Sequence, residues 1–150
     1  MKGETSTILL VEDDPDDVLL IRRAFTKAGI LDSMETVPDG EGAVAYLEGS
    51  GPYASRERFP LPAIILLDLK LPRKSGFEVL DWIRARPGLR RIPVVVLTGS
   101  EQRSDVNRAF DAGANSYLVK PVGIGALTEI LKTLNVYWLL LNERPDPHGV

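Results

Sequence analysis

Short apolar runs alternate with longer segments of helical periodicity along the chain. Apolar runs too short for a helix and bounded by turn-forming residues are typical of buried strands, whereas apolar residues three or four positions apart indicate one face of a helix. Strands that alternate with helices favour a parallel sheet covered by helices on both faces. The pattern therefore predicts an α/β protein with a doubly wound sheet of five strands, at 7–11, 34–37, 63–67, 94–97 and 116–119.

Local signals mark several of the connections between these elements. Asp14 and Pro15 have the character of a helix N-cap and a first helical residue, and Ser75 opens another helix with the spacing of a capping box. The last helix is predicted to be long, from about 125 to 141. The segment 49–62 is rich in turn formers and is predicted to be an extended surface loop, either functional or partly mobile.

Composition places the chain among ordinary globular domains. It has 150 residues, of which 44% are hydrophobic and 26% charged, and its net charge is −3. Without a clear excess of Lys and Arg, we expect no nucleic-acid partner. The longest apolar run falls far short of the ~20 residues that span a membrane, and the polar residues 1–7 are not expected to form a signal peptide. We therefore expect a cytoplasmic protein with no membrane partner.

Two residue types are nearly absent, and this narrows the chemistry. The sequence has no cysteine, and its only histidine is His148, close to the end. Disulfides, zinc–thiolate sites and Ser-His-Asp relays are therefore not expected. Carboxylate, Lys, Ser, Thr and Tyr side chains remain as reactive groups.

Polar side chains follow four of the predicted strands. Ligands of open parallel sheets bind beyond the carboxyl ends of the strands, and neighbouring strands lie only about 5 Å apart, so these groups can converge. Closely packed carboxylates resist ionising unless a cation is present, and an all-oxygen site suits Mg²⁺. A metal opposite an ammonium and a hydroxyl stabilises a transferring phosphoryl group. The residues are Glu12 and Asp13, Asp68 as the candidate nucleophile, Thr98, and Lys120.

Four blocks at these strand ends resemble the receiver domain of bacterial response regulators. They are ILLVEDD at 8–14, ILLDLKLPRKSG at 65–76, VVLTGS at 95–100 and SYLVKP at 116–121. The blocks occur in order, and the resemblance spans nearly the whole chain. It implies a flavodoxin-like fold with strand order 2-1-3-4-5.

The resemblance implies a phosphoacceptor and a metal site. Asp68 would accept a phosphoryl group from the phosphohistidine of a sensor histidine kinase. Asp13, Asp68 and the backbone carbonyl of Lys70 would ligate Mg²⁺, and Glu12 would hold a metal-bound water.

The resemblance also implies a switch. Thr98 and Lys120 would contact the phosphoryl oxygens, and Tyr117 would turn inward when Thr98 moves. The face built by helix 4, strand 5 and helix 5 would then change its arrangement. The bond between Lys120 and Pro121 would be cis. From the residues alone, the switch role of Tyr117 and a plain role as a core aromatic are nearly balanced.

Three features resemble the single-domain regulators that are paired with phytochrome-type and hybrid kinases. They are the insertion at 49–62, the block LDLKLPRKSGFEVL at 67–80, and the pair Tyr137–Trp138. The insertion is equally compatible with a neutral loop extension.

Other charged residues have simpler explanations. Asp14 is interpreted as an N-cap rather than a ligand, and Asp16 and Asp17 are expected to complement the dipole of the first helix. A local basic cluster is interpreted as a solvated loop, with an acidic partner surface as the second interpretation. This cluster comprises Arg84, Arg86, Arg90 and Arg91.

The last helix carries more apolar residues than one buried stripe requires. A contiguous exposed apolar patch usually marks an interface, so we expect a symmetric homodimer through this helix. The alternative is that the last turns fold back under a flexible tail at 143–150. The surplus residues are Val136, Tyr137, Leu139 and Leu140.

Taken together, the sequence predicts a receiver domain at 1–142 that acts as a stand-alone response regulator of a two-component phosphorelay. Only 29 residues follow Pro121, which leaves no room for an output domain. It would not be an enzyme beyond its own phosphotransfer and dephosphorylation. The alternatives are a phosphatase of the haloacid-dehalogenase type, which has a second Asp where this chain has Lys70, and a phosphorylation-independent binding module.

Overall fold

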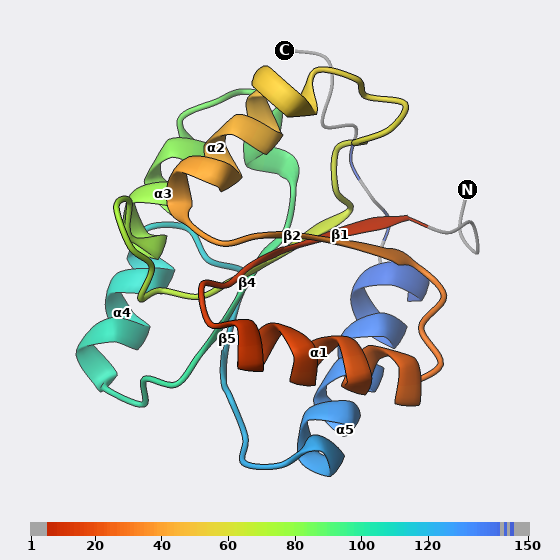
Figure 1. The fold of residues 1–150 in the computed structure, drawn as a ribbon. Helices are drawn as coiled ribbons and strands as arrows, with labels where there is room; N and C mark the ends of the chain where they lie inside the picture. The colour runs from red at the N-terminus through yellow and green to blue at the C-terminus, as the bar shows by residue number, and fades with distance from the viewer. Residues whose placement is uncertain (1–5, 142, 144, 146–150) are drawn as a thin grey trace.

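Five parallel strands form a single twisted sheet at the centre of the molecule (Figure 1). The structure is a computed structural model, and it describes residues 6–141, 143 and 145. The strand order β2-β1-β3-β4-β5 confirms the predicted flavodoxin-like arrangement. The strands are β1 (Thr7–Val11), β2 (Ser33–Val37), β3 (Ile64–Leu67), β4 (Val94–Thr98) and β5 (Ser116–Val119).

Helices cover both faces of the sheet. Figure 1 shows α1 and α5 on one face and α2, α3 and α4 on the other. The helices are α1 (Pro15–Lys27), α2 (Gly40–Glu48), α3 (Gly76–Arg84), α4 (Arg103–Asp111) and α5 (Ile124–Leu134). Short 3₁₀ turns lie at Gly51–Tyr53 and Leu89–Arg91, and a π-helical segment, Asn135–Leu141, continues α5.

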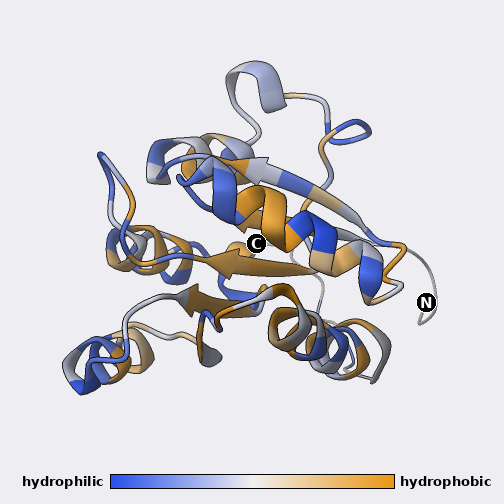
Figure 2. Cartoon of the chain, turned by 60° about the horizontal axis from the view of Figure 1, so that its bottom comes forward, coloured by the Kyte–Doolittle hydropathy of each residue, from blue (hydrophilic) through white to orange (hydrophobic). Residues whose placement is uncertain are grey.

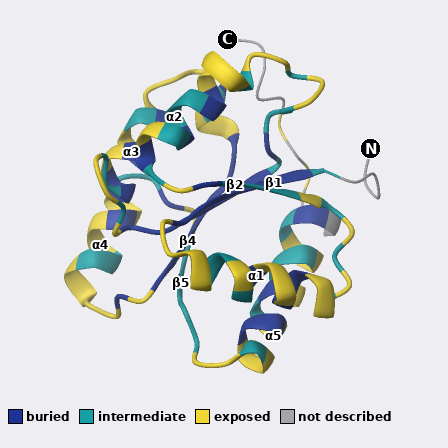
Figure 3. Ribbon diagram, viewed as in Figure 1, coloured by how far each residue is buried: buried dark blue, intermediate teal, exposed yellow. Residues whose placement is uncertain are grey.

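The alternation of side chains along the strands divides the core into two layers. On β1, Leu9 and Val11 pack beneath α2 and α3, whereas Ile8 and Leu10 pack beneath α1 and α5. Strands covered on both faces are apolar throughout, as Figure 2 shows by their hydropathy and Figure 3 by their burial. The continuous apolar runs that indicated strands in the sequence therefore follow from two-sided burial.

The predicted starts of two helices are confirmed. The Asp14 side chain accepts a hydrogen bond from the Asp16 amide (2.9 Å), and Pro15 is the first residue of α1. At the start of α3, Ser75 and Glu78 form a complete capping box. The two caps thus close the loops that carry the acidic residues, which run from the end of β1 to Pro15 and from the end of β3 to Gly76.

The 49–62 loop packs onto the end of α2 through its own side chains. The Arg56 guanidinium donates to the carbonyl oxygens of Tyr46 (2.8 Å) and Leu47 (2.7 Å), which lie in the last turn of α2, where carbonyl groups run out of partners within the helix. The Tyr46 hydroxyl donates to the carbonyl oxygen of Pro60 (2.8 Å). Three rings with centroids 5.1–6.0 Å apart complete the anchor: Tyr46, Tyr53 and Phe59.

The predicted last helix needs a correction at its end. It is α-helical only to Leu134 and then π-helical, which widens the turn and changes which side chains face the core. As a result Leu139 is buried against the layer under α1 and α5, although the sequence pattern placed it among the surplus residues. Val136 and Tyr137 are exposed as expected, and the side chain of Leu140 lies outside the described part.

The expectation of a cis bond between Lys120 and Pro121 is wrong, because the bond is trans in the structure. Trans is the intrinsically favoured form even before proline, and the Lys120 side chain reaches the carboxylates with the bond in that form. No helix among the described residues is long and apolar enough to cross a membrane. The predicted tail at 143–150 lies outside the described residues except for 143 and 145.

Candidate functional site

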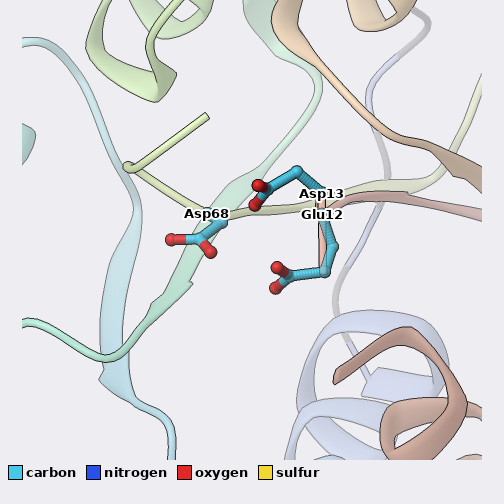
Figure 4. Close-up of side chains that lie close together, drawn as sticks. All are labelled: Glu12, Asp13 and Asp68. Carbon is cyan, nitrogen blue, oxygen red and sulfur yellow. The ribbon is translucent and has the colours of Figure 1, made fainter. Parts of the chain in front are cut away.

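Three carboxyl groups meet at the carboxyl ends of β1 and β3 (Figure 4). One oxygen each of Glu12, Asp13 and Asp68 lies within 4.8 Å of the others. The loops are held together by backbone bonds, since the Asp68 amide donates to the carbonyl oxygen of Val11 (3.1 Å). The pairing of two neighbouring strands thus brings Asp68 next to acids that are 55 residues or more away in the sequence.

Both carboxylate oxygens of Asp68 have hydrogen-bond partners. Its Oδ1 accepts from the Thr98 hydroxyl (2.8 Å) and from the Lys70 amide (3.3 Å), and its Oδ2 accepts from Lys120 Nζ (3.1 Å). Asp68 and Thr98 are buried, whereas Lys70 is exposed. The predicted hydroxyl and ammonium therefore lie against the candidate nucleophile, from β4 and from the residue that follows β5.

Lys120 is shared among three carboxylates. Its Nζ donates to Glu12 (2.5 Å), Asp17 (2.9 Å) and Asp68 (3.1 Å). Asp17 was expected only to complement the dipole of α1, and that interpretation was incomplete. It lies in the first turn of α1, which begins over the same edge of the sheet, and this position was the signal in the sequence that could have identified it.

The electrostatics of the pair Glu12–Lys120 reflect burial and attraction together. Burial raises the pKa of Glu12 to about 7, against the opposing effect of its hydrogen bond from Lys120. Burial by itself lowers the pKa of Lys120, but the hydrogen bonds to Glu12 and Asp17 outweigh it and raise the pKa above its ordinary value. One ammonium thus leaves the excess negative charge of the cluster uncompensated.

The acidic cluster has the chemistry of a divalent-cation site. Its donors are hard carboxylate oxygens that converge on one point, with Asp13 exposed to solvent at the mouth and Glu12 and Asp68 buried behind it. Mg²⁺ prefers such oxygen donors, keeps several waters and needs only one or two carboxylates. The residues present therefore fit the predicted ion, and the excess negative charge favours its binding.

A close backbone approach fixes the loop that follows Asp68. The Gly76 amide donates to the carbonyl oxygen of Leu69 (2.9 Å), and a Cβ at Gly76 would lie 2.3 Å from the carbonyl oxygen of Asp68. Real Cβ atoms do not approach backbone this closely, so only glycine fits here. The start of α3 is thereby pressed against the backbone of the candidate nucleophile.

Tyr117 lies beside the loop that follows β4. Its hydroxyl donates to the carbonyl oxygen of Ser100 (2.9 Å), two residues beyond Thr98. The Ser100 hydroxyl donates in turn to Asp105 of α4 (2.6 Å). These contacts link β5, the loop that follows Thr98 and α4.

Comparison with known proteins supports the same family. The sequence model of the response regulator receiver domain family matches residues 8–132. The probable methanogenesis regulatory protein FilR2 of Methanothrix harundinacea is 42% identical over 143 residues, which cover 93% of this chain and 88% of FilR2. The response regulator Rcp1 of Synechocystis sp. is 39% identical over 132 residues, with 88% of each chain covered.

Solved structures agree with these relatives. The phosphorylated cyanobacterial phytochrome response regulator RcpA superimposes with a TM-score of 0.87 at 38% identity, covering 95% of this chain and all of RcpA. The Mn²⁺-bound form of Rcp1 superimposes with a TM-score of 0.82 at 38% identity, covering 93% of this chain and 99% of Rcp1. With its strand order and convergent acidic site, this chain therefore belongs to the response regulator receiver family and is a response regulator of two-component signalling.

Proposed function

We propose that Asp68 accepts a phosphoryl group from the phosphohistidine of a sensor histidine kinase and that the chain acts as a phosphorylation switch. The observation that carries this proposal is the environment of Asp68. Its carboxylate lies beside two further acids, and its oxygens are bonded by the hydroxyl of Thr98 and the ammonium of Lys120. These groups suit phosphoryl transfer, which depends on positioning and on neutralising charge.

In the proposed transfer, a carboxylate oxygen of Asp68 attacks the phosphorus atom of the donor. A P–O bond forms and the P–N bond breaks, and its electron pair returns to the imidazole nitrogen of the donor. Thr98 and Lys120 are proposed to bind the phosphoryl oxygens, since both already bind Asp68. Asp13, Asp68 and the backbone carbonyl of Lys70 would hold Mg²⁺, with Glu12 binding a metal-bound water. When bound, the ion would neutralise phosphoryl charge.

The proposed output is a shift in the population of two arrangements of the face built by α4, β5 and α5. Thr98 would move toward the phosphoryl group, and Tyr117 would follow it as the aromatic switch. The contact between Tyr117 and the Ser100 carbonyl supports this route, because it joins β5 to the loop that Thr98 begins.

The proposed partner is a kinase of the phytochrome or hybrid type. The solved relatives RcpA and RtBRR are a cyanobacterial phytochrome response regulator and a bacteriophytochrome response regulator, and this chain covers 100% and 85% of them. FilR2 and Rcp1 are each covered over 88% of their length, which supports the proposal of a stand-alone receiver unit at 1–142 with no enzymatic output of its own.

We also propose a symmetric homodimer through the end of α5. An apolar groove of about 330 Å³ lies between the edge strand β5 and α5, and its lining includes Leu118, Ile130 and Trp138. The exposed ring of Tyr137 lies at the same groove, and Val136 is exposed next to it. The Tyr137 ring packs edge-on against Trp138 in the wall of the groove, and a second copy related by a two-fold axis would cover the groove and this exposed ring together.

Incubation of the purified chain with Mg²⁺ and a small phosphoramidate donor tests the phosphoacceptor. We expect one phosphoryl group per chain and complete loss of labelling in Asp68→Asn, while the exposed Asp111→Asn labels as the wild type does. Removing divalent cations with a chelator should abolish labelling. Release of many equivalents of phosphate would instead support the phosphatase alternative, and no labelling would support the binding module.

A further inference from the structure

The contact between Lys120 and Asp17 is not explained by the metal cluster. Asp17 lies 2.9 Å from Lys120 Nζ but is not among the three acids whose oxygens converge. It comes from α1, 103 residues away from Lys120 in the sequence, and its side chain is 37% exposed. A residue that only balanced a helix dipole would not need this contact.

We propose that Asp17 is a positioning residue that holds Lys120 in its resting arrangement and so opposes phosphorylation. The inference rests on the proposed function of Asp68 as phosphoacceptor. It adds a regulatory role for a carboxylate that touches neither the phosphoacceptor nor the cation site.

The hydrogen-bonding capacity of Lys120 carries the first part of the inference. An ammonium has three N–H donors, and all three are used here, by Glu12, Asp17 and Asp68. A phosphoryl oxygen can bind Lys120 only when one of these bonds is given up or shared. The resting state therefore satisfies Lys120 fully, and phosphorylation must disturb it.

The second part of the inference rests on the negative charges of Asp17 and of phosphorylated Asp68. Phosphorylation of Asp68 replaces a monoanion by a group with a charge near −2, close to Lys120 and hence close to Asp17. Glu12 belongs to the acidic cluster, where a bound cation would compensate its charge, whereas Asp17 lies outside that cluster. Repulsion between Asp17 and the phosphoryl group therefore acts only in the phosphorylated state, and the ion pair with Lys120 is strongest in the resting state.

The test compares Asp17→Asn with Asp16→Asn. Asp16 occupies the same first turn of α1 but is exposed, so its substitution removes the same charge from the helix end. Binding of beryllofluoride, a phosphoryl mimic, in the presence of Mg²⁺ is measured by titration calorimetry. We expect Asp17→Asn to bind about three- to tenfold more tightly than the wild type, Asp16→Asn to change by less than about twofold, and Asp17→Glu to restore most of the wild-type value.

A spectroscopic measurement separates positioning from a general effect on the fold. The ammonium signal of Lys120 in nitrogen-detected NMR of the metal-free protein should shift in Asp17→Asn and stay in place in Asp16→Asn. If Asp17→Asn and Asp16→Asn bound beryllofluoride with equal affinity, or if the Lys120 signal did not move in Asp17→Asn, the role of Asp17 would be overturned while the proposed function would stand. A wild type that neither binds beryllofluoride nor becomes labelled on Asp68 would overturn the proposed function together with it.

Discussion

The pKa of the Tyr46 hydroxyl is set by the surroundings of its side chain. It is fully buried in α2, and its hydroxyl donates to the Pro60 carbonyl. Burial, and to a lesser extent the charge of Glu35, raises its pKa from 10 to about 12. The folded state therefore favours the neutral phenol. The resulting stability is fully present below pH 10 and is lost as the pH rises toward 12.

Substitution of Tyr46 by Phe tests this raised pKa. In the wild type, ultraviolet absorbance of tyrosinate should show the ionisation of Tyr46 near pH 12, beside that of Tyr117, whose pKa burial also raises. Tyr46→Phe should lack the step near pH 12. The free energy of unfolding should fall less between about pH 9 and about pH 11 in Tyr46→Phe than in the wild type. Tyr137→Phe, on the exposed end of the molecule, is the control and should keep the late step. Persistence of that step in Tyr46→Phe would contradict the assignment.

Arg84 marks a limit of sequence reasoning at the residue scale. It was grouped with three neighbouring arginines as part of a solvated loop, but that interpretation is wrong for Arg84. Its guanidinium donates to the carbonyl oxygens of Gly113, Arg90 and Ile92 and to the side chain of Asn115. These acceptors come from segments up to 31 residues away. Their convergence is created by the fold, so no local pattern could reveal it.

The strands were predictable because burial leaves a local pattern in the sequence of each one. Two-sided burial demands the continuous apolar runs of β1, β3 and β4, whereas the edge strands β2 and β5 are only partly buried. The strands β1 and β5 occupy the predicted residues, while β2, β3 and β4 differ by a single residue at one end. The acidic site was predictable once the strands were placed, since strand ends in a parallel sheet share one edge. The change from α5 to a π-helix was not predictable, because helical spacing in the sequence does not distinguish the two, and packing of Leu139 against the core accompanies it.

The start of α3 should be intolerant of a methyl group at Gly76. In Gly76→Ala the new Cβ would collide with the backbone of Asp68 and Leu69, so the loop must move. We expect a loss of about 1–3 kcal/mol in the free energy of unfolding, measured by denaturant titration, together with at least about tenfold slower labelling of Asp68.

Gly125→Ala is the matched control for this prediction. Gly125 is a helical glycine in α5, and apart from the adjoining residues and backbone of its own helix no atom lies within 4 Å of the position that a methyl group would occupy there. Alanine at this position should therefore be neutral or should stabilise by up to about 1 kcal/mol. If Gly76→Ala retained the stability and labelling rate of Gly125→Ala, the close approach would not fix the phosphoacceptor loop.

At the scale of the whole molecule, β5 links the candidate site to the apolar groove. The site occupies the carboxyl edge of the sheet, and β5 leads from Lys120 back along the groove that it shares with α5. Among the described strands, β5 is an edge strand with only β4 beside it. Movement of β5 in response to Asp68 would therefore reach the groove through a single strand, without crossing the core.

The oligomeric state of the chain tests the proposed homodimer through the groove between β5 and α5. Light scattering after size-exclusion chromatography should give about twice the 16.5 kDa of one chain at high micromolar concentration. Tyr137→Glu places a charge at the centre of the proposed interface and should shift the mass to that of a monomer, because an unpaired charge is costly to bury. Leu31→Glu, on an 85% exposed residue outside the groove, should leave the dimer intact. A wild type that stays monomeric both with and without phosphorylation would refute the dimer. If Tyr137→Glu and Leu31→Glu dissociated the dimer equally, the interface would not lie at the groove.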